Sequence, residues 1–306
     1  MSSIVSSRNP DAVRRAVEVL NAGGLVGLPT ETVYGLAARA DLDSAVNKIF
    51  HAKGRPADHP LILHISHSSE IHRYAVNVPP EAISLAEQCW PGPLTLLLHK
   101  SAEVSTLVTG GRDTVAIRVP ANECARNIID LCGYSVAAPS ANVFGHVSPS
   151  TAQHVLDDLG DRVDLVIDDG GCTIGVESTI VDFTTSQPQL LRPGGLPVED
   201  LELIMDRELA MPSGESRASG MLASHYAPNC SVVLAQNIAE AKAIYEATPN
   251  SRILDHWDNF PLYAATLYTQ MRQADKDGLG TIIAVIPPKS GLGHAIVDRL
   301  SKASFL

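Results

Sequence analysis

The amino-acid sequence predicts an α/β protein of two domains joined by a linker. Short apolar runs typical of buried strands alternate with segments of helical periodicity along most of its 306 residues. A stretch rich in Gly, Ser and Pro, which includes PSGESRASG, interrupts this alternation. Domains typically contain about 100–200 residues. We therefore place a first domain at residues 1–195, a linker at 196–229 and a second domain at 230–306.

The first elements follow from their boundary residues. A proline at the first turn and an apolar stripe with helical spacing predict a helix that ends before two adjacent glycines. LVGLP is then a short buried strand, and a second helix is expected over residues 42–52. The segment PTETVYGLAARAD between them is expected to be a loop. Its Thr30 and Thr32 either contact a ligand or only satisfy turn backbone groups.

The remaining strands of the first domain are apolar runs. LILHI, LTLLL, VAIRV and SVAA are apolar enough to be covered on both faces, and helical patterns begin near Pro80, Ala121 and Ser150. STIVDF and PQLLR, with turn-forming residues between them, predict a closing hairpin.

The second domain repeats a strand–helix–strand order from Cys230 onward. SVVLA, SRILD and TIIAVIP predict strands, with helices over NIAEAKAIYEA, near residues 264–276 and from about Leu292. This spacing is typical of a small parallel, doubly wound sheet.

Composition limits the classes of partner. With a net charge of -11 and a pI near 5.4, the chain lacks a long-range positive field for nucleic acid, although a local basic pocket is compatible with it. No run approaches the roughly 20 apolar residues of a membrane helix, and the N-terminus lacks a signal-peptide core. The five cysteines form no CxxC pair, and the eleven histidines lack metal-ligand spacing. We therefore expect a cytoplasmic protein with no membrane contact and no metal site of its own.

The segment KGRPADHPL carries the densest group of cations. Lys53, Arg55 and His59 lie in a proline-restricted loop that would suit triphosphate oxygens, although Lys53 could instead offset a helix dipole. His64, inside the apolar run LILHI, is more typical of a core histidine than of a ligand contact. Arg118 interrupts the strand VAIRV and needs a partner, which could be a structural carboxylate or a substrate carboxylate.

Two further segments place small donors after strands. AAPSANVFGHVSPS contains Ser140, Asn142 and Ser148, and GGCTIGVEST sets paired glycines before Ser178. Glycines allow backbone N–H groups to approach phosphate or carboxylate closely. Arg192 adds a cation at the end of PQLLR. The P-loop pattern is absent from the sequence.

Seven ordered motifs in the first domain resemble the YrdC-type threonylcarbamoyl-AMP synthases: GLPTETVYGLAARA, KGRPADHPLILHI, WPGPLTLLL, VAIRVP, APSAN, GVESTIVD and LLRPG. SHYAP and the following α/β segment resemble the longer two-domain branch of that family. The resemblance implies an open, twisted YrdC-like α/β sheet around a positively lined cavity, with a smaller Rossmann-like C-terminal domain. It also implies that L-threonine, bicarbonate or CO2, and ATP with Mg²⁺ give threonylcarbamoyl-AMP and pyrophosphate, for tRNA modification by downstream threonylcarbamoyl-transfer proteins.

The resemblance also assigns residues. Those implied to line the threonine pocket are Thr32, His64, Arg118, Ala138 and Ser178. Those implied to hold ATP are Lys53, Arg55, His59, Thr114, Ser140, Ser148, Arg192 and, reaching back from the linker, Tyr226. Catalysis would rest on positioning and on charge stabilisation by Lys53 and Arg55.

Two other functions are considered. A related carbamoyltransferase would want an acylphosphatase-like segment and zinc-finger cysteines, and neither occurs in the sequence. A non-catalytic double-stranded RNA-binding module could use a positive concavity, but the acidic charge and the small-molecule motifs disfavour it. Contact of this chain with tRNA itself is left open.

Overall fold

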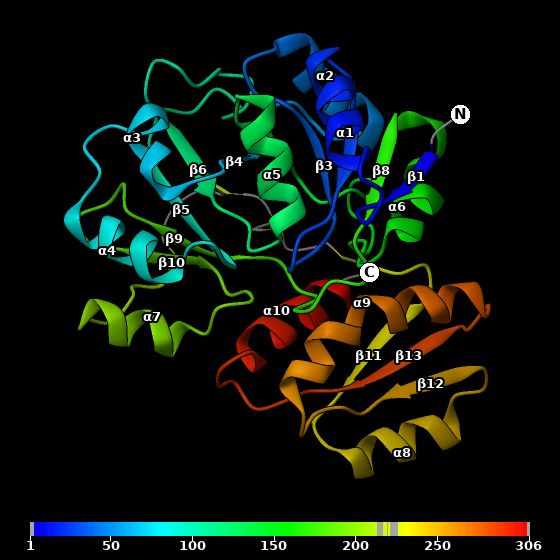
Figure 1. The fold of residues 1–306 in the computed structure, drawn as a ribbon. Coiled ribbons are helices and arrows are strands. Elements are labelled where there is room, and N and C mark those ends of the chain that lie inside the picture. The colour runs from blue at the N-terminus through cyan, green and yellow to red at the C-terminus, as the bar shows by residue number, and fades with distance from the viewer. Residues whose placement is uncertain (1–2, 213–216, 219, 221–225, 305–306) are drawn as a thin grey trace.

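The computed structural model describes residues 3–212, 217–218, 220 and 226–304. Its larger part is a mixed sheet of ten strands in the order β1-β8-β2-β3-β7-β4-β6-β5-β9-β10 (Figure 1), and this confirms the predicted α/β fold class. In chain order the strands are β1 (Ser3–Ser6), β2 (Val26–Leu28), β3 (Gly35–Arg39), β4 (Ile62–His64), β5 (Leu94–His99), β6 (Thr114–Arg118), β7 (Val136–Ala137), β8 (Leu165–Asp168), β9 (Thr179–Asp182) and β10 (Gln189–Arg192).

Helices cover the two faces of this sheet with separate hydrophobic cores. On one face lie α1 (Ala12–Asn21) and α5 (Glu123–Cys132); on the other lie α2 (Asp43–Lys53), α3 (Ile71–Tyr74), α4 (Pro80–Cys89) and α6 (Ala152–Leu159), with 3-10 turns at Ser68–Glu70 and Gly160–Arg162. Successive strand residues point to opposite faces. Ala37 of β3 accordingly joins the first core, while Leu36 and Ala38 join the second.

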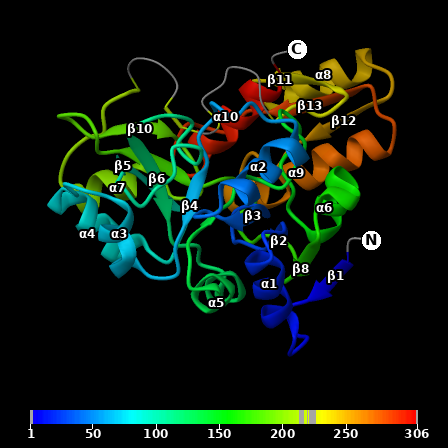
Figure 2. The same ribbon diagram turned by 90° about the horizontal axis from the view of Figure 1, so that it is seen from above.

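The second domain has the predicted parallel sheet. Its strands β11 (Ser231–Ala235), β12 (Ser251–Leu254) and β13 (Thr281–Val285) pair in the order β11-β13-β12. Helix α8 (Ile238–Ala247) packs on one face, whereas α9 (Phe260–Lys276) and α10 (Gly293–Ala303) pack on the other. Both views place α9 and α10 between the small sheet and the large domain (Figures 1 and 2).

The predicted helices and strands are present, and the closing hairpin is confirmed by the antiparallel pairing of β9 with β10. The expectation that PTETVYGLAARAD is only a loop is wrong, because β3 lies within it and pairs antiparallel with β2. Its sequence GLAAR has no β-branched or aromatic residue to indicate a strand. Strands β1 and β8 and helix α3 were also not predicted.

Helix α7 (Val198–Met205) lies within the range predicted as linker. It packs against α4, and its Leu201 is fully buried, so this part of the range is ordered structure. The domain boundaries themselves stay a prediction. Among the described residues, no helix combines the length and the apolar character needed to cross a membrane.

Candidate active site

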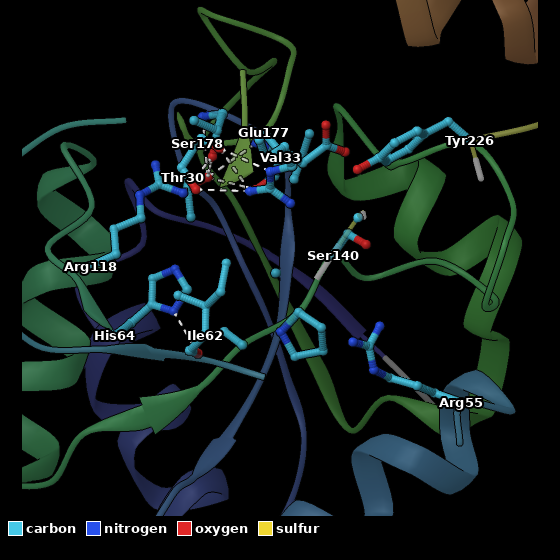
Figure 3. A pocket seen from close by; sticks show the side chains of 16 residues that line it. Thr30, Val33, Arg55, Ile62, His64, Arg118, Ser140, Glu177, Ser178 and Tyr226 are labelled. Carbon is cyan, nitrogen blue, oxygen red and sulfur yellow. Dashed lines mark hydrogen bonds between the residues drawn. The ribbon is translucent and has the colours of Figure 1, made fainter. Parts of the chain in front are cut away.

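A concave pocket lies between the large sheet and the linker. Its walls are formed by Thr30, Thr32, Val33, Gly35, Arg55, Ile62, His64, Arg118, Ala138, Pro139, Ser140, Glu177, Ser178, Arg192, Gly220 and Tyr226. Figure 3 shows His64 and Arg118 toward one end, with Arg55 and Tyr226 toward the other.

All five residues implied for threonine line the cavity. Strands β4 and β6 run parallel, and their register places His64 beside Arg118 where both strands end. Thr32 lies in the turn after β2, Ala138 directly follows β7, and Ser178 directly precedes β9. The structure therefore brings side chains from five separate segments to one cavity.

Arg118 has a structural carboxylate partner. Its Nη2 donates to Glu31 Oε1 at 2.5 Å, its Nη1 to Thr32 Oγ1 at 2.8 Å, and its Nε to the Gly92 carbonyl at 3.1 Å. A guanidinium has five N–H donors, so these bonds leave two for the cavity that Arg118 lines. Glu31, which the sequence analysis did not single out, fixes the orientation of this arginine. It also accepts from the Ala121 backbone N–H at 3.0 Å.

His64 is a buried neutral imidazole. Burial, together with the nearby charge of Arg118, lowers the pKa of His64 to about 3. Its Nδ1 lies 3.2 Å from the Ile62 carbonyl, which can only accept, so Nδ1 carries the proton. Nε2 is therefore an acceptor. His64 is buried, as a core residue would be, and it also lines the cavity.

This low pKa predicts a pH-dependent loss of stability. The unfolded chain binds a proton on His64 below pH 6.5, whereas the folded chain binds it only near pH 3, so stability falls as pH falls through that window. Between pH 7 and pH 5 we expect this histidine to account for about 2 kcal/mol of lost unfolding free energy. In urea unfolding, His64→Asn should lose less unfolding free energy between pH 7 and pH 5 than the wild-type protein loses. The control is the surface variant His67→Asn; equal losses in wild type and His64→Asn would contradict the prediction.

The opposite end of the cavity contains Arg55. Its Nη2 donates to the Pro60 carbonyl at 2.9 Å, and its guanidinium lies 5.5 Å from the centre of the Phe144 ring. Burial lowers the pKa of Arg55 to about 10, so the side chain stays charged at neutral pH. Ser140 also lines this part of the cavity.

The structure does not bring four other residues implied for ATP to the cavity wall. The Lys53 ammonium is buried and donates to the carbonyls of Ser140 and Asn142, both at 2.5 Å. It therefore fixes the loop that carries Ser140. His59 packs edge-on against Phe144, and Thr114 begins β6 about 13 Å along the strand from Arg118, at about 3.3 Å per residue. The fourth, Ser148, is treated below.

Arg192 and Ser178 form a buried pair in the lining of the cavity. Arg192 donates from Nε and Nη2 to the Ser178 carbonyl, at 3.1 and 2.8 Å, and from Nη2 to Ser178 Oγ at 3.0 Å. Ser178 Oγ also lies 2.7 Å from Thr95 Oγ1. These bonds fix a hydroxyl and a cation at the start of β9 and the end of β10.

Glu177 is a cavity residue to which the sequence analysis gave no role. It accepts from Ser148 Oγ at 2.6 Å, from Arg299 Nε at 2.6 Å and from the Tyr268 hydroxyl at 2.9 Å. Burial alone would raise its pKa, but Arg299, Arg192 and the hydrogen bonds lower the pKa of Glu177 to about 2. Ser148 is thus a partner of a buried carboxylate that joins both domains.

Tyr226 is brought to the cavity by the linker, as the resemblance implies. Its ring stacks on Tyr268 at 5.9 Å between centroids, and the Arg299 guanidinium lies 4.9 Å from the ring centre. Of the SHYAP motif, Tyr226, Ala227 and Pro228 are described, whereas Ser224 and His225 lie outside the described residues.

The described side chains that line the cavity do not form a divalent-metal site. Glu177 is the one carboxylate among the described lining residues, and its oxygens already accept from Ser148, Tyr268 and Arg299. No group of three or more His, Cys, Asp or Glu side chains in the described ranges could hold a metal ion.

Comparisons with known proteins agree across both domains. The Sua5/YciO/YrdC family model, described as "Telomere recombination", matches residues 18–194, and the model "Threonylcarbamoyl-AMP synthase, C-terminal domain" matches residues 196–304. The chain is 41% identical to the threonylcarbamoyl-AMP synthase of Pyrococcus abyssi, over 95% of this chain and 94% of that protein. It is 36% identical to the threonylcarbamoyl-AMP synthase of Bacillus subtilis, over 97% of this chain and 94% of that protein.

A crystal structure of P. abyssi Sua5 complexed with L-threonine matches with a TM-score of 0.94 and 38% identity, over 99% of this chain and 97% of that one. Both halves of the chain are thus matched in sequence, and its whole architecture is matched in structure. The chain belongs to the Sua5/YciO/YrdC family, in its two-domain form.

Proposed function

We propose that this protein is a threonylcarbamoyl-AMP synthase, a nucleotidyltransferase that uses L-threonine, bicarbonate or CO2, and ATP. The observation that carries the proposal is a single cavity with one end suited to an amino acid and the other to a nucleotide. Relatives that bear this name match nearly the whole chain, which favours the synthase over the carbamoyltransferase and over the double-stranded RNA-binding module.

Threonine binds at the end formed by Arg118, His64 and Thr32. The two remaining guanidinium donors of Arg118 bind the threonine carboxylate, and charge-assisted hydrogen bonds of this kind are the strong ones. The His64 Nε2 lone pair accepts a hydrogen from the threonine hydroxyl or amine, because this imidazole is neutral. Ala138 and Ser178 complete the wall.

ATP occupies the end formed by Arg55, Ser140 and Tyr226. Arg55 and Arg192 are buried cations whose charge opposes that of the phosphates, and electrostatic stabilisation is stronger in a site that excludes water. The described lining residues offer no carboxylate set for Mg²⁺, so we propose that the ion arrives bound to the ATP phosphates. Lys53 acts indirectly, since its ammonium holds the loop of Ser140 and Asn142. Ser148 acts through its hydrogen bond to Glu177, and His59 through its packing on Phe144 beside Arg55; no role is assigned to Thr114.

The reaction then depends on orienting the two substrates and needs no covalent intermediate with the protein. The threonine amine adds to CO2, losing a proton, and gives a carbamate; from bicarbonate the same step releases water. A carbamate oxygen attacks the α-phosphorus, the bond to the β-phosphate oxygen breaks, and pyrophosphate leaves. Holding the two reactants together can supply about 7–11 kcal/mol of the barrier. Arg55 and Arg192 stabilise the charge that grows on the leaving group.

The mixed anhydride that results is reactive, so a separate protein that transfers the threonylcarbamoyl group to tRNA is proposed as its consumer. We place both in the cytoplasm. The acidic net charge of -11 supports transfer to a partner more than direct capture of tRNA by this chain.

The proposal is tested by pyrophosphate release. Purified protein with labelled L-threonine, bicarbonate and ATP should release pyrophosphate and form labelled threonylcarbamoyl-AMP. D-threonine is the control, because a site built from L-residues is chiral and should not hold both enantiomers in the reactive orientation. Release that is the same without threonine would overturn the assignment.

A further inference from the structure

Helix α10 of the second domain contacts the described linker residues that line the cavity. Lys302 donates from Nζ to the Gly220 carbonyl at 2.6 Å, and the Arg299 guanidinium lies over the Tyr226 ring. Asp298 pairs with both cations and so fixes their side chains relative to each other. One helix therefore holds two separate points of the linker, Gly220 and Tyr226, at the same cavity.

These two linker residues also touch each other. A Cβ added to Gly220, whose φ is +81°, would lie 2.5 Å from Tyr226 Oη and 3.1 Å from Arg192 Nη1. Tyr226 itself has a φ of +64°, a left-handed conformation that is strained for a bulky side chain. Such strain, of order 1–3 kcal/mol, persists only where the surroundings over-determine it. Here the surroundings are Tyr268 and Arg299, both fully buried.

The contact extends into the large domain. Arg299 Nε and the Tyr268 hydroxyl both donate to Glu177, which itself lines the cavity. Val33, Val147 and Val176 of the large domain share one hydrophobic cluster with Tyr226 and the cores of α9 and α10. Residues of the second domain therefore set the position of Tyr226, and two of them also bind Glu177 in the cavity wall.

Burying the charged Arg299 side chain costs more free energy than burying an apolar side chain, so a purely structural position would not favour an arginine. It is fully buried, and its Nη2 has no hydrogen-bond partner within the described residues. Buried polar groups are normally hydrogen-bonded, and apolar side chains of similar volume often replace buried ion pairs without loss of stability. A role in placing Tyr226 gives a reason for the arginine.

We propose that Arg299 and Lys302 are positioning residues for the nucleotide end of the cavity: α10 holds Tyr226 and Gly220 in the binding-competent arrangement before ATP arrives. This rests on the proposed function for the identity of the nucleotide. When the competent arrangement is only partly populated, apparent affinity falls by that fraction while a saturated site still turns over. Loss of positioning therefore raises KM for ATP and spares kcat.

The test compares Arg299→Met and Lys302→Met with Arg252→Met, which removes an exposed ion pair with Asp277 in the same domain. We expect KM for ATP to rise about tenfold in the first two variants, with kcat within about twofold of wild type. Arg252→Met should match wild type. Unchanged KM, or a lower kcat at unchanged KM, would overturn the proposal, because a smaller folded fraction lowers kcat alone.

A double-variant cycle links the effect to Tyr226. In a Tyr226→Ala background, Arg299→Met and Lys302→Met should change KM for ATP by less than about twofold, since contacting residues are non-additive. Additive effects would mean that α10 acts by another route. Lys302 is partly exposed, so its variant keeps the test valid if Arg299→Met does not fold.

Hydrogen exchange without nucleotide separates this proposal from the proposed function. Peptides that contain Tyr226 should exchange faster in Arg299→Met, while peptides from β4 and β6 keep the wild-type rate. Unchanged exchange at Tyr226 would overturn the positioning role. Failure of the wild-type protein to bind ATP would instead overturn the function, whatever the exchange result.

Discussion

Replacing Arg118 by alanine should weaken L-threonine binding by about 2–5 kcal/mol, or roughly 30-fold to several thousand-fold. The guanidinium is buried, oriented by Glu31 and by the Gly92 carbonyl, and has two donors left for a ligand carboxylate. Isothermal titration calorimetry of threonine into each protein measures the effect directly. An affinity within twofold of wild type would remove Arg118 from the threonine site.

The same substitution leaves Glu31 as a buried, unpaired carboxylate, which by itself destabilises the fold. The matched control is the double variant Arg118→Ala with Glu31→Gln, in which no uncompensated charge remains. We expect it to recover unfolding free energy relative to Arg118→Ala, but not threonine affinity. Recovery of both would show that lost threonine binding came from misfolding alone.

Glu177→Gln should lower the free energy of unfolding by about 3–5 kcal/mol, the usual range when one partner of a buried ion pair is removed. The reason is that Arg299 is fully buried and would lose its pairing with the carboxylate that joins both domains. Chemical denaturation followed by circular dichroism measures the loss, with the first transition used if the domains unfold separately.

Glu199 provides the matched control for Glu177. It also pairs with α10, through His294 Nε2 at 3.1 Å, but its side chain is 48% exposed. Exposed pairs contribute little, so Glu199→Gln should change stability by no more than about 1 kcal/mol. Similar losses in the two variants would mean that burial does not determine the strength of this interface.

Much of the fold could be predicted because its signals are local. The β4 run LILHI and the hairpin of β9 and β10 have patterns that involve only neighbouring residues. Strand β3 was missed since its small residues become a strand only through pairing with β2 and β7. Helix α7 was not predicted because it lies beside segments rich in Gly, Pro and Ser, which are typical of a linker. Its packing on α4 stabilises it.

The residues of the candidate site also fall into two groups, those that local motifs identify and those whose contacts depend on the fold. His64 and Arg118 could be assigned from motifs, and parallel register places them together. The sequence could not reveal that the Lys53 ammonium turns toward loop carbonyls, because a cation near a helix end is equally compatible with a ligand. Glu177 lies in the quoted motif GVEST, but its partners Tyr268 and Arg299 are 91 and 122 residues away.

Because Glu177 pairs with Arg299 across the domain interface, neither domain can readily be replaced by the corresponding domain of another protein. A chimera that joins this first domain to a foreign second domain inherits a buried carboxylate whose counter-charge was on the discarded half. Unless the new half supplies an arginine at the position of Arg299, that carboxylate is left with the charge of Arg192 and the hydrogen bond from Ser148, and its pKa should rise. Substitutions in the GVEST segment and in α10 should therefore be tolerated in pairs more readily than alone.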